Sequence, residues 1–197
     1  MCVQGQPTAR PPLRRCVIGQ VTIALVDVHY DGSAARAACV VASSWEAEST
    51  LEAHAVQIAH VEPYQPGCFY RRELPCLLAV LRLLTAPPDA VVIDGYVWLS
   101  ASERAGLGAH LHEALGKSAA VVGIAKTAFA GAQRCAVVAQ VFRGRSLRPL
   151  YVTAAGIDVE LAAQCVRRMA GRHRIPELAR KVDRLARAKG GLGQNAA

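Results

Sequence analysis

The sequence lacks any long apolar segment. Nowhere in its 197 residues do about 18 uncharged apolar residues follow one another, as a membrane-spanning helix requires. Internal repeats and low-complexity tracts are also absent. Residues 1–16 contain basic side chains, but no apolar stretch with a cleavage-like site follows them directly. We therefore interpret residues 1–16 as a flexible leader and not as a signal peptide, and we expect no membrane partner.

Paired cysteines are lacking as well. The chain contains seven cysteines, an odd number, and they are scattered without a single CxxC pair. A zinc site or a disulfide framework would need closer or more regular spacing. We therefore expect neither, and we expect the protein to work in the reducing cytoplasm.

Acidic residues are scarce toward the C-terminus. The whole chain has 23 Lys and Arg against 15 Asp and Glu, a formal net charge of +8. The excess is concentrated in residues 143–189, which include the runs FRGRSLR and RHRIPELARKVDRLARAK. A basic balance favours polyanionic partners, nucleic acid first and anionic membrane second, although charge that serves only solubility is the alternative. Nothing in the sequence indicates a protein partner.

The hydrophobic residues that are present suit a single α/β domain. They make up 52% of the chain, which is enough for one compact core. We assign residues 17–190 to this domain and residues 191–197 to a disordered tail. Apolar runs and helical spacing predict strands at 17–29, 35–44, 52–60, 90–96, 119–125, 135–142 and 150–154, and helices at 71–84, 107–115, 158–169 and 175–189. This order predicts a mixed central sheet flanked by helices.

Two aspartates follow apolar strand segments. Asp27 lies in VTIALVDVHYDG, and Asp94 repeats the pattern in AVVIDGY. A carboxylate at the end of a central strand costs several kcal/mol to bury alone, so a partner must offset it. A basic side chain or a helix N-terminus would suffice for each, but functional groups gather at the carboxyl ends of strands. The repetition favours a shared site that holds a divalent cation.

Two further acids extend this set. Glu73 lies where a loop leads into a helix, and Asp183 lies in the basic run RKVDRLAR. Taken singly, each is an ordinary helical acid. Two strand aspartates with a helical glutamate and a helical aspartate form the ligand set of a metal-dependent nuclease of the RNase H kind. Oxygen ligands suit Mg²⁺ or Mn²⁺, and two such ions about 3.5–4 Å apart can activate a water and stabilise the leaving oxygen.

Six segments in the same order resemble the motifs of the endonuclease V family. They are VDVHY, PYQPGCFYRRELP, VVIDGY, GLGAHL, VVGIAK and RHRIPELARKVDRLAR. The resemblance covers residues 21–188. It implies an RNase H-like fold and a metal-dependent endonuclease of nucleic-acid repair or processing, which cleaves a phosphodiester bond 3′ to deoxyinosine in DNA or inosine in RNA.

The resemblance also implies roles for individual residues. Asp27, Glu73 and Asp94 would form the main metal site for Mg²⁺ or Mn²⁺, and Asp183 would help to hold the metal or its water. Lys126 matches the lysine that closes the GVAK motif and would neutralise charge near the scissile phosphate. From the residues alone, Lys126 could equally be an ion-pair partner of Asp27 or Asp94.

The PYQPG loop resembles the family's wedge. Tyr64, held by prolines that include Pro66, would push into the duplex where the damaged base is turned out, because an inserted side chain must not yield. The pocket for the flipped base would be lined by Gly67, Cys68, Phe69 and Gly95. Without the resemblance, the loop reads as a rigid turn and Phe69 as a core residue.

The segment after Asp94 departs from the family pattern. The family usually has DGHG followed by His-Pro-Arg, whereas this chain has DGYVWLS, with Ser100 at the place of the histidine. Tyr96 and Trp98 are large and would crowd or reshape the base pocket. His110 and His112 are two positions apart and cannot share a helix face, so they do not replace the missing histidine. Two alternatives follow, namely a nucleic-acid-binding relative that has lost cleavage and a metal-dependent phosphodiesterase of altered specificity.

Overall fold

The computed structural model describes residues 21–63, 65, 67, 69–100, 104–129 and 136–188. Among these residues, the predicted strands and helices are all present in the predicted order. The predicted leader and tail, and the domain limits at residues 17 and 190, lie outside the described residues and stay predictions.

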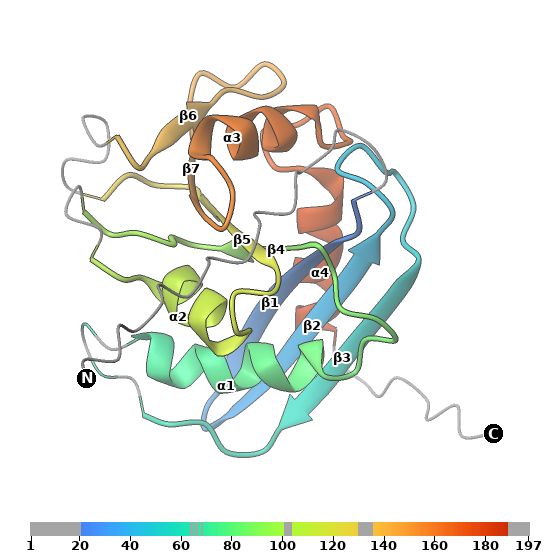
Figure 1. Cartoon of the computed structure of the whole chain (residues 1–197). Helices are drawn as coiled ribbons and strands as arrows, with labels where there is room; N and C mark the ends of the chain where they lie inside the picture. Colours follow the sequence, from blue (N-terminus) through green and yellow to red (C-terminus); the bar gives the residue numbers. More distant parts are fainter. Residues whose placement is uncertain are drawn as a thin grey trace, which may run out of the picture.

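A mixed sheet forms the centre of the molecule (Figure 1). Within the described residues it has seven strands in the order β3-β2-β1-β4-β5-β7-β6. The pairs β1–β4 and β4–β5 are parallel, and the remaining neighbours are antiparallel. The strands are β1 (Ile23–Asp31), β2 (Ala34–Ala42), β3 (Glu52–Ile58), β4 (Ala90–Asp94), β5 (Ala120–Ala125), β6 (Ala139–Val141) and β7 (Leu150–Ala155). The predicted mixed sheet is confirmed.

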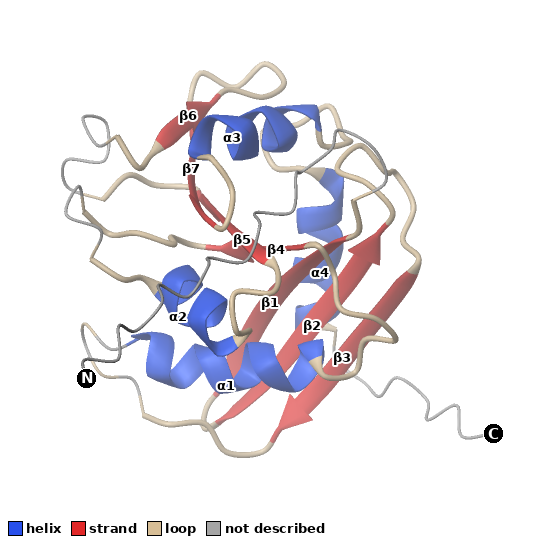
Figure 2. Ribbon diagram, in the orientation of Figure 1, coloured by secondary structure: helices blue, strands red, loops and turns tan. Residues whose placement is uncertain are grey.

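Helices cover both faces of this sheet (Figure 2). On one face, α1 (Phe69–Leu81) and α2 (Leu107–Ala114) pack on a core that includes Val26 and Ile93. On the other face, α3 (Val159–Arg168) and α4 (Glu177–Arg187) pack on a core that includes Leu25 and Val92. Because β1 and β4 are buried on both faces, both side-chain rows of these strands are apolar, which explains the continuous runs IALV and AVVI.

Some element limits differ from those predicted. Strand β1 ends at Asp31, two residues beyond the predicted limit. Helix α1 begins at Phe69, so Pro75 lies in the helix interior and not in the first turn as we had expected. There, Pro75 removes the N–H that would bond to the carbonyl four residues earlier. Asp158 caps α3 as expected, because its side chain accepts a hydrogen bond from the Leu161 N–H at 3.0 Å.

The parallel strands place their carboxyl ends at one edge of the sheet. Strands β1, β4 and β5 run in the same direction, and the chain leaves β4 at Asp94 and β5 at Ala125. Helices α1 and α4 pack on opposite faces of β1 and β2. No helix in the described parts of the chain is long and apolar enough to cross a membrane.

Candidate active site

The register of two parallel strands brings Asp27 and Asp94 together. Val26 lies opposite Ile93 in the last β1–β4 pair, and the two aspartates are the next residue on each strand. Side chains alternate between the two faces along a strand, so both aspartates follow Leu25 and Val92 to the face that α4 covers. We expected Asp27 near the end of its strand, but it lies at the middle. The reason is that β1 stays paired with β2 as far as Asp31. The carboxylate lies where β4 stops.

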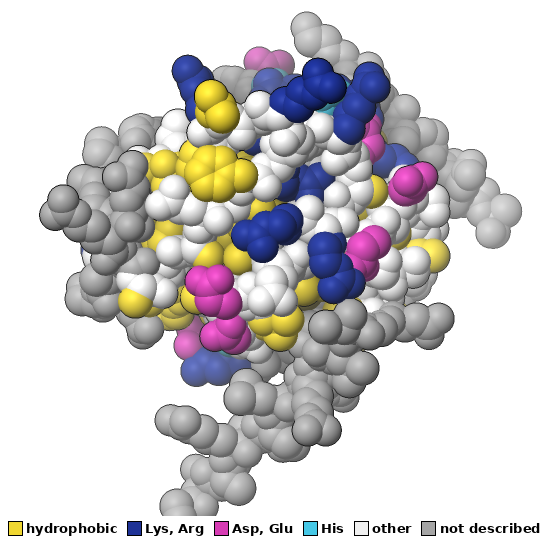
Figure 3. All heavy atoms as spheres, turned by 90° about the horizontal axis from the view of Figure 1, so that it is seen from above, with side chains coloured by type: hydrophobic (Ala, Val, Ile, Leu, Met, Phe, Trp, Pro, Cys, Tyr) yellow, Lys and Arg dark blue, Asp and Glu magenta, His cyan; other side chains and the backbone are white. Residues whose placement is uncertain are grey.

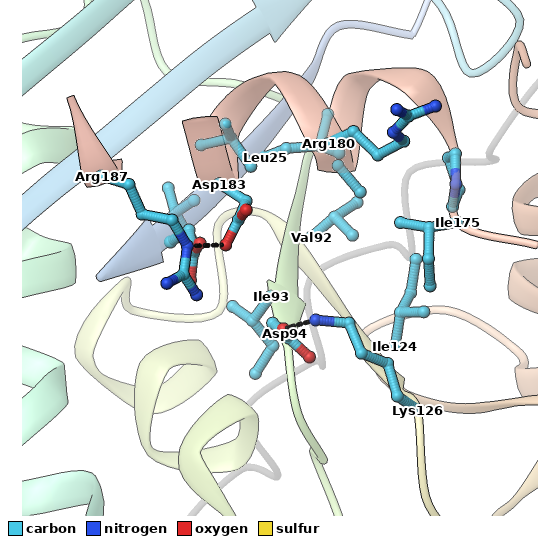
Figure 4. Close-up of a pocket in the computed structure, with 15 residues that line it drawn as sticks. Leu25, Val92, Ile93, Asp94, Ile124, Lys126, Ile175, Arg180, Asp183 and Arg187 are labelled. Atoms are coloured by element: carbon cyan, nitrogen blue, oxygen red, sulfur yellow. Dashed lines mark hydrogen bonds and ion pairs between the residues drawn. The ribbon is translucent and has the colours of Figure 1, made fainter. Parts of the chain in front are cut away.

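A pocket of about 280 Å³ opens beside these aspartates, between the sheet and α4 (Figure 4). Its apolar wall comes from the strands and from one side of α4. Charged side chains surround this wall, and three of the predicted acids are among them. The apolar wall consists of Leu25, Val92, Ile124, Ile175, Pro176, Ala179 and Val182, the charged residues are Asp27, Asp94, Lys126, Arg180, Asp183 and Arg187, and the lining also includes Val26 and Ile93, which belong to the core on the opposite face.

Glu73 lies on α1, on the other face of the sheet, and does not line this pocket, but the charges of Asp27 and Asp94 act on it. Its side chain is buried, with 7% exposure, and its Oε2 atom has no hydrogen-bond partner among the described residues. Burial, followed by repulsion from Asp27 and Asp94, raises the pKa of Glu73 from 4.5 to about 8. Oε2 of Glu73 thus lacks the hydrogen-bond partner that a buried polar atom normally has.

Asp27 is under similar electrostatic stress. Burial, followed by repulsion from Asp94, raises the pKa of Asp27 from 3.8 to about 6. Its Oδ1 atom accepts a hydrogen bond from the N–H of Val28 at 2.9 Å, which only partly offsets this effect. Asp27 forms no ion pair with any residue that the structure describes.

Basic residues pair with the other two acids. Lys126 Nζ lies 2.5 Å from Asp94 Oδ2, and Arg187 Nε donates to Asp183 Oδ1 at 2.8 Å (Figure 4). Each pair engages one of the two oxygens of the carboxylate. The ion-pair role that the sequence left open for Lys126 is therefore the one seen here, with Asp94 as the partner.

The donor set fits a hard divalent cation in its chemistry. All the candidate ligands are carboxylates, which Mg²⁺ and Mn²⁺ prefer, and the partnerless oxygen of Glu73 and the mutual repulsion of the acids both call for positive charge. Within the described residues, however, no three His, Cys, Asp or Glu side chains are already grouped closely enough to hold a metal ion. An ion bound directly by three of these acids would require them to move closer together.

Sequence reasoning missed three arginines at this site. Arg180 and Arg187 line the pocket. Arg174 donates to the carbonyl oxygens of Lys126 at 2.5 Å and Pro149 at 2.7 Å, which ties the end of β5 to the loop before β7. Arg187 lies four residues after Asp183, a spacing that places two side chains on one helix face. That spacing was the available signal.

The predicted base-binding residues are only partly described. Tyr64, Pro66 and Cys68 lie outside the described residues. Gly67 and Gly95 have φ values of +80° and +145°, in the region that favours glycine. Phe69 is the first residue of α1 and is 43% exposed. It is therefore not a core residue, and a role at the surface stays open to it.

The segment DGYVWLS, which departs from the family pattern, packs against residues that follow β5 and against β7. The hydroxyl of Tyr96 donates to the carbonyl of Thr127 at 2.6 Å, and its ring meets Phe129 edge-on. Val97 is fully buried, and the indole N–H of Trp98 donates to the carbonyl of Ala154 at 2.8 Å. Neither Tyr96 nor Trp98 lines the pocket that contains Asp27, Asp94 and Asp183. The prediction that they crowd or reshape the base pocket therefore does not extend to the proposed metal site.

The polar residues nearby have structural partners. The hydroxyl of Ser100, at the place of the expected histidine, accepts from the backbone N–H of Arg104 at 3.1 Å. His110 stacks on Tyr70 with 3.7 Å between ring centroids, whereas Nδ1 of His112 lies 3.0 Å from the carbonyl oxygen of Ala119. The two histidines thus face different partners, as their spacing predicts.

The sequence is similar to known endonucleases along most of its length. The family model described as Endonuclease V matches residues 15–184. The Endonuclease V of Rhodospirillum centenum is 33% identical over 189 residues, which covers 85% of this chain and 77% of that protein.

Solved structures give the same result. Endonuclease V from Streptomyces avermitilis superposes with a TM-score of 0.67 at 26% identity, covering 86% of this chain and 81% of that one. Endonuclease V from Ciona intestinalis, in complex with a DNA containing an inosine, superposes with a TM-score of 0.70 at 19% identity, covering 85% and 84%. The second likeness concerns the fold alone. The predicted RNase H-like fold is confirmed.

Proposed function

Because the chain belongs to the endonuclease V family, we propose that it is a metal-dependent endonuclease that cleaves a phosphodiester bond 3′ to inosine or deoxyinosine. The observation that carries this proposal is the convergence of acids at one edge of the sheet. Asp27 and Asp94 follow the last parallel pair of β1 and β4, and Glu73 lies close enough that their charges raise its pKa. Glu73 is buried and Asp27 is partly buried, and holding their charges near that of Asp94 is unfavourable unless a cation compensates them.

We propose that Asp27, Glu73 and Asp94 hold Mg²⁺ or Mn²⁺, with Asp183 holding the metal or its water. When bound, the ion would supply a water of lowered pKa and neutralise charge on the phosphate. The burial of Glu73 restricts where its carboxylate can lie, and the apolar wall of the pocket keeps bulk water away from one side of Asp27 and Asp94. These features support the assignment of the four acids.

Lys126 has a separate role in this proposal. Its amino group lies at the pocket beside Asp94, where a phosphodiester would approach the acids. We propose that Lys126 contacts a phosphate oxygen and stabilises the charge that builds up there during cleavage, an effect typical of preorganised cations in active sites. Arg180 and Arg187 line the same pocket and add positive charge toward which a phosphate backbone is drawn.

The base-recognition residues are proposed from the family resemblance. Tyr64 and Pro66 would form the wedge, and Gly67, Phe69 and Gly95 would line the pocket for the extruded base. Base extrusion costs a few kcal/mol and costs least where pairing is already poor, as beside hypoxanthine. The Endonuclease V from Ciona intestinalis has been solved in complex with a DNA containing an inosine, and we propose the same substrate class for this chain on the family resemblance.

A nucleic-acid-binding protein without cleavage is the second candidate. It is favoured by one observation, namely that Lys126 and Arg187 already neutralise Asp94 and Asp183 without a metal. The DGYVWLS segment favours a third candidate, a phosphodiesterase of altered specificity, because it alters the surroundings of Gly95. Action in the cytoplasm, expected from the cysteine pattern, stays a prediction.

One cleavage experiment separates these candidates. End-labelled DNA and RNA strands carrying one inosine, with matched strands carrying guanosine, are incubated with the protein and Mg²⁺, Mn²⁺ or a chelator. A single metal-dependent cut at the second phosphodiester bond 3′ to inosine supports the proposal. Binding without a cut, unchanged in Asp94→Ala, supports the second candidate. Cleavage of the inosine-free strands alone supports the third.

A further inference from the structure

The loop between β6 and β7 lies at the same sheet edge as the acids. Val141 at the end of β6 pairs with Leu150 at the start of β7, and Tyr151 pairs with Ala125 at the carboxyl end of β5. Residues 142–149, which connect β6 to β7, therefore emerge beside the ends of β4 and β5. This loop extends the edge of the active site away from β1.

The loop presents apolar and basic side chains to solvent. Phe142 is 54% and Leu147 is 93% exposed, and Arg145 and Arg148 are exposed beside them. Figure 3 looks down on this part of the molecule and shows hydrophobic side chains exposed among Lys and Arg. We define the hairpin surface as Phe142, Arg145, Leu147, Arg148 and the neighbouring Arg172.

Arg172 belongs to this surface because two loops touch there. Gly144 has a φ of +58°, and a Cβ at this position would collide with the carbonyl oxygen of Arg172. The close approach of the two backbones therefore depends on glycine. It brings the backbone of Arg172, whose side chain is exposed, against the loop that carries Arg145 and Arg148.

The hairpin surface carries uncompensated positive charge. No Asp or Glu occurs in residues 141–157 or in residues 161–176. The guanidinium groups of Arg145, Arg148 and Arg172 form no ion pair with the described residues. Other arginines nearby do have such partners, since Arg168 pairs with Glu46 and Arg180 pairs with Glu177. A patch of one sign without counter-charges attracts an anionic partner.

The hairpin surface is also fixed in place. The side chain of Arg143 is buried, with 5% exposure, and its guanidinium donates hydrogen bonds to a set of carbonyl oxygens at and beyond the end of α3. These are the carbonyls of Val166, Arg167, Met169, Ala170 and Gly171. Arg174 then joins the carbonyl of Pro149, at the base of the loop, to that of Lys126. The backbone of the loop that carries Arg145 and Arg148 is thus tied to the end of α3 and to the end of β5 at Lys126.

We propose that the hairpin surface binds the sugar–phosphate backbone of the strand that flanks the cleaved bond, an inference that rests on the proposed function. Three strand spacings separate β4 from β6, which is about 14 Å. That span matches about four nucleotides of one strand of a duplex. Arg145, Arg148 and Arg172 would contact phosphates, and Phe142 offers an exposed ring on which an unpaired base stacks.

The test compares a double substitution on the hairpin surface with a matched control. The variant Arg145→Gln/Arg148→Gln removes two charges from the surface, and Arg82→Gln/Lys117→Gln removes two exposed charges at the opposite edge of the sheet. Binding to fluorescent inosine-containing DNA is measured in Ca²⁺ or chelator at several salt concentrations. The strands carry flanks of two, six or twelve nucleotides on either side of the inosine.

We expect the hairpin double variant to bind the long-flanked strands about tenfold more weakly, with a salt slope smaller by about two, because two phosphate contacts are lost. Its binding to strands with the shortest flanks stays at the wild-type level, and the control variant matches the wild type throughout. A Phe142→Ser variant is expected to weaken binding only where the flank is single-stranded. Circular dichroism and thermal melting confirm that each variant is folded.

Equal binding by the hairpin variant and the control at every flank length would overturn the proposal. A loss of self-association, or of binding to vesicles that contain phosphatidylserine, with unchanged DNA binding would overturn it too, because the occupant would then be a second copy or a lipid surface. The proposed function fails separately. If the wild type binds long flanks through these arginines but never cuts beside inosine, the hairpin surface stands and the cleavage assignment does not.

Discussion

Lys126 Nζ lies 2.5 Å from Oδ2 of Asp94, so an ion pair links the carboxyl ends of two neighbouring parallel strands. A cation that binds Asp94 competes with this ammonium group. A phosphate brought to the pocket offers the ammonium group a second anionic partner. We therefore expect Lys126 to weaken metal binding, because it competes for Asp94, and to favour cleavage, because it can contact the phosphate.

We expect Lys126→Ala to bind Mn²⁺ at least as tightly as the wild type, because Asp94 loses its competitor. Cleavage in a single turnover should fall by about a hundredfold, the usual effect of removing one preorganised donor. Isothermal titration with Mn²⁺ and quenched-flow cleavage of an inosine strand measure the two effects. Lys117→Ala, which breaks the pair with Glu113 on α2, is the control and should change neither. Weaker Mn²⁺ binding by Lys126→Ala would contradict this account.

The raised pKa of Glu73 makes metal-free stability depend on pH. Burial raises this pKa from 4.5 to about 8, so between these pH values the folded state keeps a proton that the unfolded state has released. The free energy of unfolding therefore falls as the pH rises through this range. The raised pKa of Asp27 acts in the same direction between pH 3.8 and about 6.

Glu73→Gln should remove most of this dependence. In the presence of a chelator, we expect the variant to be more stable than the wild type by a few kcal/mol at pH 8 and equal to it at pH 4, where both side chains are neutral. Urea unfolding at a series of pH values measures the difference. Parallel pH profiles for the two proteins would show that Glu73 is not buried as a carboxylate.

Metal binding should stabilise the wild type but not variants that lack a ligand. At a Mn²⁺ concentration about 100 times its Kd, we expect about 2.7 kcal/mol of added stability. Asp27→Asn and Asp94→Asn should lose both this gain and cleavage while remaining folded, and they should be more stable than the wild type without metal because carboxylate repulsion is relieved. Asp158→Asn, which keeps a capping side chain on α3, should respond to Mn²⁺ like the wild type.

Arg174 is expected to position Lys126 through the backbone. Its hydrogen bonds to the carbonyls of Lys126 and Pro149 are lost in Arg174→Ala, so the end of β5 becomes free to shift. A misplacement of about 1 Å can reduce a rate by about a hundredfold. We therefore expect the single-turnover rate to fall with little change in Kd for the inosine strand. A purely structural role would instead lower the melting temperature and leave the rate of the folded fraction unchanged.

The strand aspartates could be predicted from sequence because burial leaves a clear pattern. Four apolar residues before Asp27 and four before Asp94 mark strands covered on both faces, and parallel strands end at a common edge. The position of Asp27 within β1 could not be predicted in this way. It depends on β2, which pairs with β1 as far as Asp31, and pairing between strands leaves no mark on the local sequence.

The basic partners of the acids were harder to predict. Lys126 was recognised as a possible partner of Asp94 because it follows the end of a buried strand. Arg187 was missed because a pair four residues apart on an exposed helix is common and usually without function. Arg174 was missed for a different reason, since its acceptors are carbonyl groups, which every residue carries.

The anchoring of Arg143 has a consequence for how this protein can diverge. Among the described residues its guanidinium is held by main-chain oxygens, so this anchor does not depend on the identity of the side chains around the end of α3 as long as the chain keeps its path. The tip of the neighbouring loop can then vary from one relative to another without disturbing the catalytic centre. Evolution could change what this corner of the molecule binds while the acids proposed to hold metal keep their places.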